Sequence, residues 1–224
     1  MSNVLTISLL ALAVLAVTLA SCATHRVEGT DTVERSNFAE TLSLVGDSAT
    51  ALVGVRTFEA PDYEVLEKDG RFEVRRYDDL AVVRSSSSAG PVRDGGEAFV
   101  RLFEYLSGAN ERDKKVAMTV PVLVEDSSDS MEMTFVLPGR YTADTAPAPD
   151  AGEVETATVE GGRIATVRFA GRLSDRNVAK RTEELQEWLG ERGLTAVGAP
   201  LSAGYDPPFT LPFLRRNEVW IRVQ

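Results

Sequence analysis

The C-terminal stretch Tyr205-Asp-Pro-Pro-Phe-Thr-Leu-Pro-Phe-Leu-Arg-Arg-Asn-Glu-Val-Trp-Ile-Arg-Val223 combines a stiff loop with a β-strand. Its prolines remove backbone donors and hold the chain extended, with apolar side chains between them. The basic pair Arg215 and Arg216 then leads into a segment typical of a strand. Such a loop suits a wall for a flat apolar ligand with acidic edges. It can equally serve to cover one end of a barrel, with its arginines in structural pairs.

Three parts of the chain resemble the SOUL/haem-binding protein family. The matching segments are Tyr63–Leu66 with Phe72–Tyr77, Val116–Val122, and Tyr205–Phe209 with Arg215–Trp220. They occur in the order of the family and extend from Tyr63 to the C-terminal end. The resemblance implies a SOUL haem-binding domain over 61–224. It also implies an α+β fold of two related halves, with an antiparallel sheet curled into a distorted β-barrel and two helices outside.

The N-terminal segment predicts export and attachment to a membrane. Val4–Ala20 is almost wholly apolar, which is typical of a signal peptide, here assigned to 1–21. Leu19-Ala20-Ser21-Cys22 resembles a bacterial lipobox, in which the cysteine is lipidated. The alternative is an uncleaved anchor, which the absence of Lys and Arg before the apolar run favours. Both interpretations place the domain outside the cytoplasm, tethered at the cell envelope.

Composition narrows the class of partner. The 224 residues include 34 acidic and 24 basic ones, for a net charge of −10. This balance argues against nucleic acid or an anionic membrane surface as the main partner. The part after Cys22 is long enough for one domain with a real core. With one His and one Cys, the chain has no Cys/His metal cluster.

Residues 22–60 are predicted to link the anchor to the domain. The segment Ala23–Asn37 is polar and without periodicity, so it reads as a flexible tether. Apolar residues then recur in steps of three and four, which predicts a short helix that docks on the domain. These residues are Phe38, Leu42, Val45, Ala49 and Leu52.

The hydrophobic patterns from residue 63 predict the same series of elements twice: hairpin, helix, strand, strand. In the first half we expect strands at 63–67, 72–77, 80–84, 116–125 and 131–137, and a helix that ends near Leu106. A loop over 142–152 follows. In the second half Gly161-Gly162 predicts a hairpin between 154–160 and 163–169. Asp175 is the expected N-cap of a helix that ends near Gly190, before strands at 195–201 and 217–223.

The resemblance implies a tetrapyrrole site between the first helix and the C-terminal loop. The candidate residues are Phe99, Val100, Arg101, Phe103 and Leu106 from the helix, with Tyr205, Phe209, Leu211, Phe213, Arg215 and Arg216 from the loop. Arginines suit the two propionates of haem. Haem-binding relatives place lysines where this chain has Glu104 and Thr210, and Glu104 would repel a propionate. The alternative is that Phe99, Leu102 and Phe103 all pack on the sheet.

An internal His–Fe bond is excluded by counting, because the one histidine, His25, lies in the tether. The methionines Met118, Met131 and Met133 are more typical of a core. Weaker candidates as iron ligands are Tyr105, Tyr141 and Tyr205. Some members described as haem binders hold the macrocycle mainly by hydrophobic contact, and the resemblance implies this mode for loosely bound haem here.

We therefore predict a membrane-tethered binding protein for haem or another tetrapyrrole, rather than an enzyme. Three alternatives stay open in the sequence. The same groove could carry other apolar or amphipathic small molecules. A barrel glutamate, among Glu73, Glu132 and Glu218, could serve a hydrolase if burial raised its pKa. A structural envelope lipoprotein is a third possibility, if the groove is filled by its own side chains.

Overall fold

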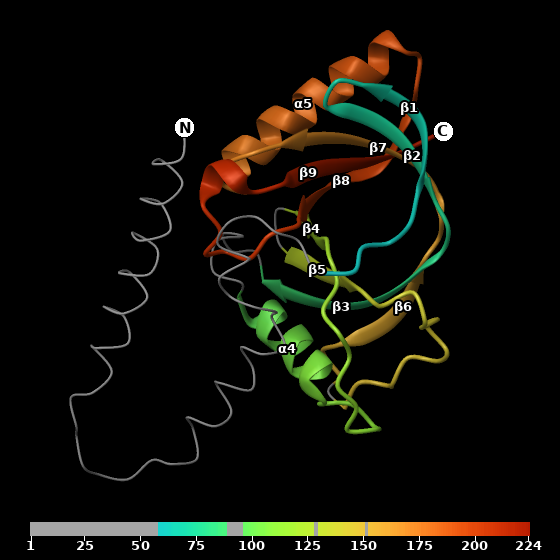
Figure 1. The fold of residues 1–224 in the computed structure, drawn as a ribbon, viewed down its shortest axis with the longest axis vertical. Helices are drawn as coiled ribbons and strands as arrows, with labels where there is room; N and C mark the ends of the chain where they lie inside the picture. Colours follow the sequence, from blue (N-terminus) through green and yellow to red (C-terminus); the bar gives the residue numbers. More distant parts are fainter. Residues whose placement is uncertain (1–57, 89–95, 128–129, 151) are drawn as a thin grey trace, which may run out of the picture. The chain divides into compact units, whose positions relative to one another are not determined.

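A computed structural model describes residues 58–88, 96–127, 130–150 and 152–224 (Figure 1). The predicted signal peptide, Cys22, the tether and the helix at 38–52 lie outside the described residues. Within these ranges, neither helix combines the length and the apolar character needed to span a bilayer.

The described chain forms one nine-stranded antiparallel sheet with two α-helices, which confirms the α+β class. The strands are β1 (Glu64–Asp69), β2 (Phe72–Tyr77), β3 (Leu80–Ser88), β4 (Val122–Asp126), β5 (Ser130–Val136), β6 (Glu155–Val159), β7 (Gly162–Phe169), β8 (Ala196–Gly204) and β9 (Asn217–Val223). The helices are α4 (Gly96–Ser107), α5 (Asp175–Glu191) and the short 3₁₀ helix η2 (Pro212–Leu214).

The strands follow the order β1-β2-β7-β9-β8-β4-β5-β3-β6. This order has two ends, β1 and β6, so the closed barrel expected from the sequence is not confirmed. The sheet curls strongly, and the two helices lie at opposite ends of the curl (Figure 1). The curl gives the sheet an inner, concave face and an outer face, which the helices cover.

Two halves of the chain have the same pairing pattern, β2-β3-α4-β4-β5 and β6-β7-α5-β8-β9. In each half the strand before the helix pairs with the last strand, and the two strands after the helix pair with each other. The first strand of each half pairs with the other half, β2 with β7 and β6 with β3. The β4–β8 pair joins the halves in the middle of the sheet.

The predicted hairpin between β6 and β7 is therefore wrong, because these two strands pair with different neighbours. The turn itself is present. The Gly161 amide donates to the Asp79 carboxylate at 2.8 Å, where the β6–β7 connection passes the β2–β3 connection. A Cβ on Gly161 would lie 2.5 Å from the Tyr77 carbonyl oxygen, so this crossing requires glycine. A local turn signal cannot show that the two strands continue into different parts of the sheet.

Two smaller predictions are also corrected. The strand expected at 116–125 begins only at Val122, because Pro121 has no N–H to give to a ladder. The N-cap of α5 is Ser174, and Asp175 is its first helical residue. In contrast, the predicted β1–β2 hairpin is confirmed, with Asp69 opposite Phe72.

Each helix covers a separate core on the outer face. α4 packs against β3 and β5 through Leu102, Tyr105 and Leu106, all nearly inaccessible to solvent. α5 packs against β7, β8 and β9, with Leu185 and Trp188 in its core. A third cluster fills part of the inner face of the sheet. These three cores leave a cavity on the inner face and the apolar side chains of the β8–β9 loop accessible.

Candidate functional site

The loop between β8 and β9, Tyr205–Arg216, is held by hydrogen bonds to its own backbone. The Arg215 guanidinium donates from Nε to the Thr210 carbonyl at 2.7 Å and from Nη2 to the Pro208 carbonyl. The Asp206 carboxylate accepts from the Arg216 amide at 2.6 Å. These bonds define the shape of the loop without an external ligand.

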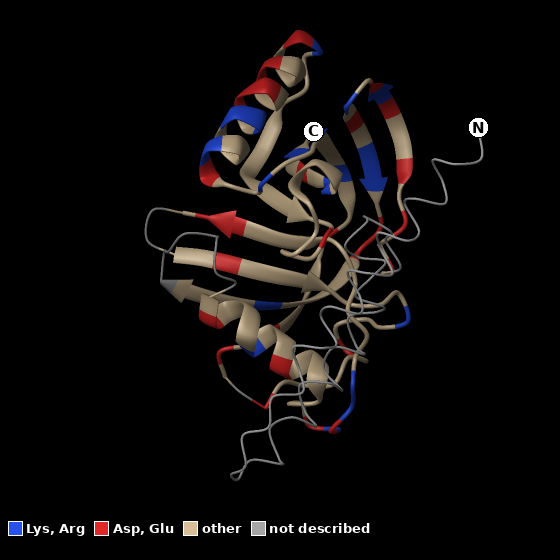
Figure 2. Cartoon of the chain, turned by 60° about the vertical axis from the view of Figure 1, so that its left-hand side comes forward, with Lys and Arg blue, Asp and Glu red and all other residues tan. Residues whose placement is uncertain are grey.

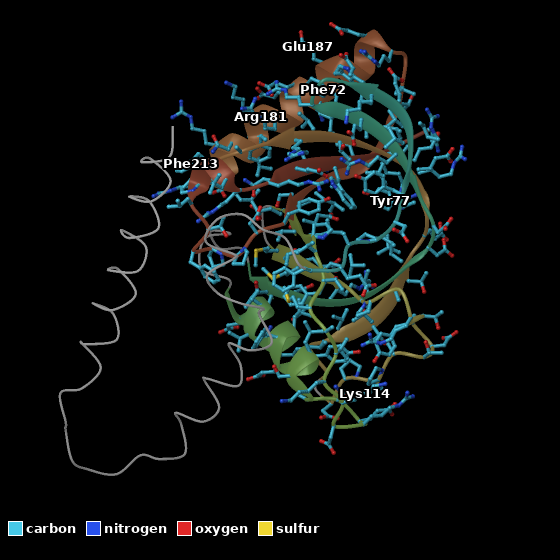
Figure 3. All side chains as sticks on the ribbon, viewed as in Figure 1. Phe72, Tyr77, Lys114, Arg181, Glu187 and Phe213 are labelled. Carbon is cyan, nitrogen blue, oxygen red and sulfur yellow. The ribbon has the colours of Figure 1, made fainter. Side chains whose placement is uncertain are left out.

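Three apolar side chains project from this loop into solvent. Phe209 is 45% exposed, Leu211 46% and Phe213 71%. The Pro212 carbonyl accepts from the Gly171 amide at 2.8 Å, which fixes η2 beside the connection that leads into α5. Figure 3 shows Phe213 at the outer edge of the fold, next to the first turn of α5. The loop therefore presents an apolar surface that its own bonds keep in place.

The helix residues of the predicted site divide into buried and exposed members. Leu106 is in the core, while Phe99 packs edge-on against Phe135, with ring centroids 5.5 Å apart. Phe103 is partly exposed and stacks on Phe99. Val100 is 54% exposed. The alternative in which this helix packs on the sheet thus holds for its inner side, and Val100 lies on its outer side.

The helix and the loop are set apart in the structure. Figure 1 shows α4 below β3 and β5, whereas η2 lies beside the start of α5. Arg101 of α4 is bound to Glu153 at 2.7 Å and to Glu97 at 3.0 Å. Glu104 is exposed on α4, and Thr210 of the loop is buried. The two predicted walls are thus separate surfaces in this conformation.

Tyr205 and Arg216 belong to a buried network around Glu218 on the inner face. The Glu218 side chain is fully buried. Its carboxylate accepts from the Arg75 guanidinium at 2.8 and 3.1 Å and from the Arg216 guanidinium at 2.6 and 2.9 Å. The Tyr205 hydroxyl and the Trp220 indole N–H donate to the same carboxylate at 2.9 and 2.8 Å. The sequence did not predict this network, because Arg75 and Glu218 meet only when β2 and β9 enter the same sheet.

Electrostatics in this network argue against the hydrolase expectation. Burial alone would raise the pKa of Glu218, but hydrogen bonds and positive charge from Arg75 and Arg216 lower it to about 2. The pKa of Glu73 is also lowered, because Lys68 and Arg75 outweigh its burial. The expectation of a raised pKa is therefore wrong for both residues. Both carboxylates are ionised and paired with arginine, so neither is a protonated acid.

Glu132, the third predicted glutamate, lines a cavity of about 380 Å³ on the inner face. Aromatic and aliphatic side chains form much of its wall, among them Tyr77, Trp220, Leu123 and Leu201. Arg84 lies 3.8 Å from the Glu132 carboxylate. This cavity was not predicted as a site, because no local pattern shows which strand residues will enclose a space.

Comparison with known proteins identifies the family. The sequence profile of the family described as SOUL heme-binding protein matches residues 58–222. The chain belongs to this family. It is 29% identical to Heme-binding protein 1 of Xenopus tropicalis, over 75% of this chain and 92% of that protein. It is 30% identical to Heme-binding protein 1 of Mus musculus, over 56% of this chain and 69% of that protein.

Solved structures share the fold at much lower sequence identity. The C-terminal domain of EcmrR is 11% identical, with a TM-score of 0.51, over 72% of this chain and 98% of that one. A hydrolase from Listeria innocua is 13% identical, with a TM-score of 0.50, over 71% of this chain and 94% of that one. Likeness at this level shows the fold of this SOUL chain and nothing of its chemistry.

The candidate iron ligands of the SOUL domain lie in its cores. Met131 and Met133 are buried under α4, and Met118 packs against the same cluster. The Tyr105 hydroxyl donates to the Pro147 carbonyl at 2.9 Å, and Tyr141 is largely buried. In the described ranges no three His, Cys, Asp or Glu side chains converge as a metal site. His25 lies outside these ranges.

Proposed function

We propose that this SOUL-family chain binds haem or another tetrapyrrole loosely, on the apolar surface of its Tyr205–Arg216 loop. The observation that carries the proposal is the exposure of Phe209, Leu211 and Phe213 on a loop held by its own hydrogen bonds. A preformed apolar surface suits a flat macrocycle, since little ordering is needed on binding. Relatives that carry the name Heme-binding protein 1 support the choice of ligand class.

The charges near the loop favour the acidic edge of a tetrapyrrole. Arg215 has two of its nitrogens bonded to loop carbonyls, and its Nη1 has no hydrogen-bond partner among the described residues. Arg176 and Lys180 lie in the first half of α5, where Arg181 is already paired with Glu184 at 2.6 Å (Figure 2). Arginine can hold a carboxylate by two parallel bonds. Arg216 is already bound to Glu218, so Arg215 is the better propionate partner.

Hydrophobic contact, rather than an internal histidine bond, is the proposed mode of holding the macrocycle. The chain would supply apolar contact and orientation, and any chemistry would be that of the haem iron and ring. Val100 and Phe103 of α4 are accessible to solvent, but they lie on a separate surface and are not part of the loop site. Leu106 and Tyr205 support these surfaces from the core. This role is one of binding, for buffering or transfer, and not of catalysis.

The proposed location is the cell envelope, beyond the cytoplasmic membrane, with the domain tethered through lipid on Cys22. The apolar run before this single cysteine supports the proposal. Metabolic labelling with a clickable palmitate analogue, followed by membrane fractionation, tests it. The wild-type chain should carry label and sediment with membranes, and Cys22→Ser should do neither. Equal labelling of the two would refute the lipid anchor.

A hemin titration of Val27–Gln224, which lacks Cys22 and His25, tests the binding function. We expect a saturable one-to-one shift of the Soret band. Phe213→Ser should weaken it at least about tenfold, because a buried Phe contact contributes roughly 1.5–3 kcal/mol. Arg215→Ala should weaken it as well.

The matched control is Val65→Ser on β1, which removes another exposed apolar side chain far from the loop in the sequence. It should bind hemin as the wild type does. Absence of saturable binding would refute the function. Binding that is indifferent to both loop variants would keep the ligand class but move the site elsewhere.

A further inference from the structure

The cavity on the inner face has the size and walls of a small-molecule site, separate from the loop surface. Its volume of about 380 Å³ falls in the range of roughly 300–1,000 Å³ found for ligand pockets. Residues from both halves of the chain line it, among them Tyr77, Trp220, Leu123 and Leu201, with Leu201 directly opposite Trp220 in the β8–β9 pair. Tyr77 and Trp220 have ring centroids 5.0 Å apart and ring planes tilted by 32°, so the two aromatic residues of the lining are in contact.

A bulge in β8 shapes one wall of this cavity. The pairing of β8 with β9 shifts between Val197 and Leu201, so the intervening residues leave the regular ladder. Gly198 in this bulge has φ +86, and a Cβ built on it would meet nothing within 4 Å. Ala199 is exposed and lines the cavity. The opening is thus built into the strand geometry.

Both arginines around the cavity have hydrogen-bond partners, whereas most of the carboxylates there have none in the part of the chain that the structure describes. The two cations are Arg84 and Arg222, and the carboxylates are Asp78, Glu125, Glu132 and Glu160. Arg222 donates to the carbonyl oxygens of Gly161 and Glu160. Arg84 donates at 3.1 Å to Glu155, a residue that does not line the cavity. Among the described residues, the carboxylates of Asp78, Glu125 and Glu160 have no ion-pair or hydrogen-bond partner. The cavity therefore has an excess of unneutralised negative charge.

We infer that this cavity binds a small organic cation with an apolar or aromatic body. The carboxylates favour a positive charge, and low-dielectric walls strengthen that preference. The faces of Tyr77 and Trp220 add attraction for a cation and apolar contact for its body. The two propionates of haem would be repelled here. The inference goes beyond the proposed haem function and does not depend on it.

Glu125 and Glu132 are the residues through which the charge preference is best tested. They lie directly opposite each other on β4 and β5, and both line the cavity. Replacing both by Gln keeps their shape and removes two negative charges. Glu125 is exposed and Glu132 is partly exposed, so the change should leave the fold intact.

The experiment is calorimetric titration of the full chain in a neutral detergent, with protein-free micelles as the blank. The probes are (2-naphthylmethyl)trimethylammonium and naphthalene-2-sulfonate, which share an aromatic body and differ in charge. The cation should bind one to one, and the sulfonate at least about tenfold more weakly. Glu125→Gln/Glu132→Gln should weaken cation binding by about tenfold. Ala199→Trp, which fills the cavity from its rim, should abolish it.

Glu187→Gln is the control for loss of one negative charge, since Glu187 is exposed on α5 (Figure 3). It should bind the cation like the wild type, and thermal melts should show all variants folded. The inference is overturned if the cation does not bind saturably, or if the sulfonate binds equally well. Binding unaffected by both the Gln pair and Ala199→Trp would also overturn it. Hemin binding should be the same in all these variants.

Discussion

The two halves of the molecule each place a glutamate on the inner face of their last strand, and they surround it differently. Glu218 on β9 is fully buried and accepts hydrogen bonds from two arginines, a tyrosine and a tryptophan. Glu132 on β5 has a side chain that is 38% exposed, with Arg84 at 3.8 Å. The surroundings of Glu218 are therefore closely packed, whereas Glu132 lines a cavity to which both halves of the chain contribute.

The difference shows how one architecture can give a structural site and a ligand site from related positions. Around Glu218 each charge has an opposite partner, so the network can remain in a water-free interior. Around Glu132 the negative charges outnumber their partners, and only contact with solvent or a ligand can compensate them. A fully satisfied network specifies the fold, whereas an unsatisfied one is available for binding.

The largest expected effect comes from breaking the packed side. Glu218→Gln leaves the Arg75 and Arg216 guanidinium groups buried without their carboxylate, and should lower the free energy of unfolding by about 3–5 kcal/mol. Glu132→Gln should change it by less than about 1 kcal/mol, because its ion pair is partly exposed. Urea denaturation of the two variants measures the contrast. Equal losses of unfolding free energy would mean that the two glutamates contribute equally to stability.

Lowering the pH should also destabilise the network around Glu218. The pKa of Glu218 lies at about 2, below its ordinary value of 4.5, which corresponds to about 3 kcal/mol. Because the folded-state pKa is lowered, this stability is present above about pH 4.5 and is lost as the pH falls towards 2. Urea midpoints at pH 7, 4 and 3 should fall steeply for the wild type. The fall should be shallower for Glu218→Gln, and an unchanged slope would contradict the assignment.

The smallest of these effects concerns the point where the halves cross. Gly161→Ala should destabilise the fold by about 1–3 kcal/mol, because its Cβ would lie 2.5 Å from the Tyr77 carbonyl oxygen. Gly152→Ala is the matched change, since a Cβ there meets nothing within 4 Å. Thermal unfolding compares the two. If both variants melt like the wild type, the crossing is looser than its geometry indicates.

Local patterns predicted most elements but not their partners. The alternation in 72–77 and 217–223 predicted strands, and both are confirmed as β2 and β9. The Gly161-Gly162 pair predicted a turn correctly and a hairpin wrongly, since turn chemistry is local and strand pairing is not. The sequence allowed a barrel-interior position for Glu218, and the curled sheet does bury this residue, but alternation alone could not show that both faces of β9 are covered.

The candidate site was predictable in part. The stiff, apolar character of the Tyr205–Arg216 loop follows from its prolines and its composition. Its sequence could not separate the exposed Phe213 from the buried Tyr205, because both are aromatic residues in one loop. The cavity left no signal at all, since its lining comes from strands across the whole domain.

By itself, the sequence determined the family, the α+β class and the position of nearly every helix and strand. These depend on motifs, on residue propensity and on periodicity, which act over a few residues. Only the tertiary structure decided which glutamate is neutralised and which faces a cavity. Arg75 and Glu218 are 143 positions apart in the chain, and their contact exists only because the folded sheet brings β2, β7 and β9 side by side.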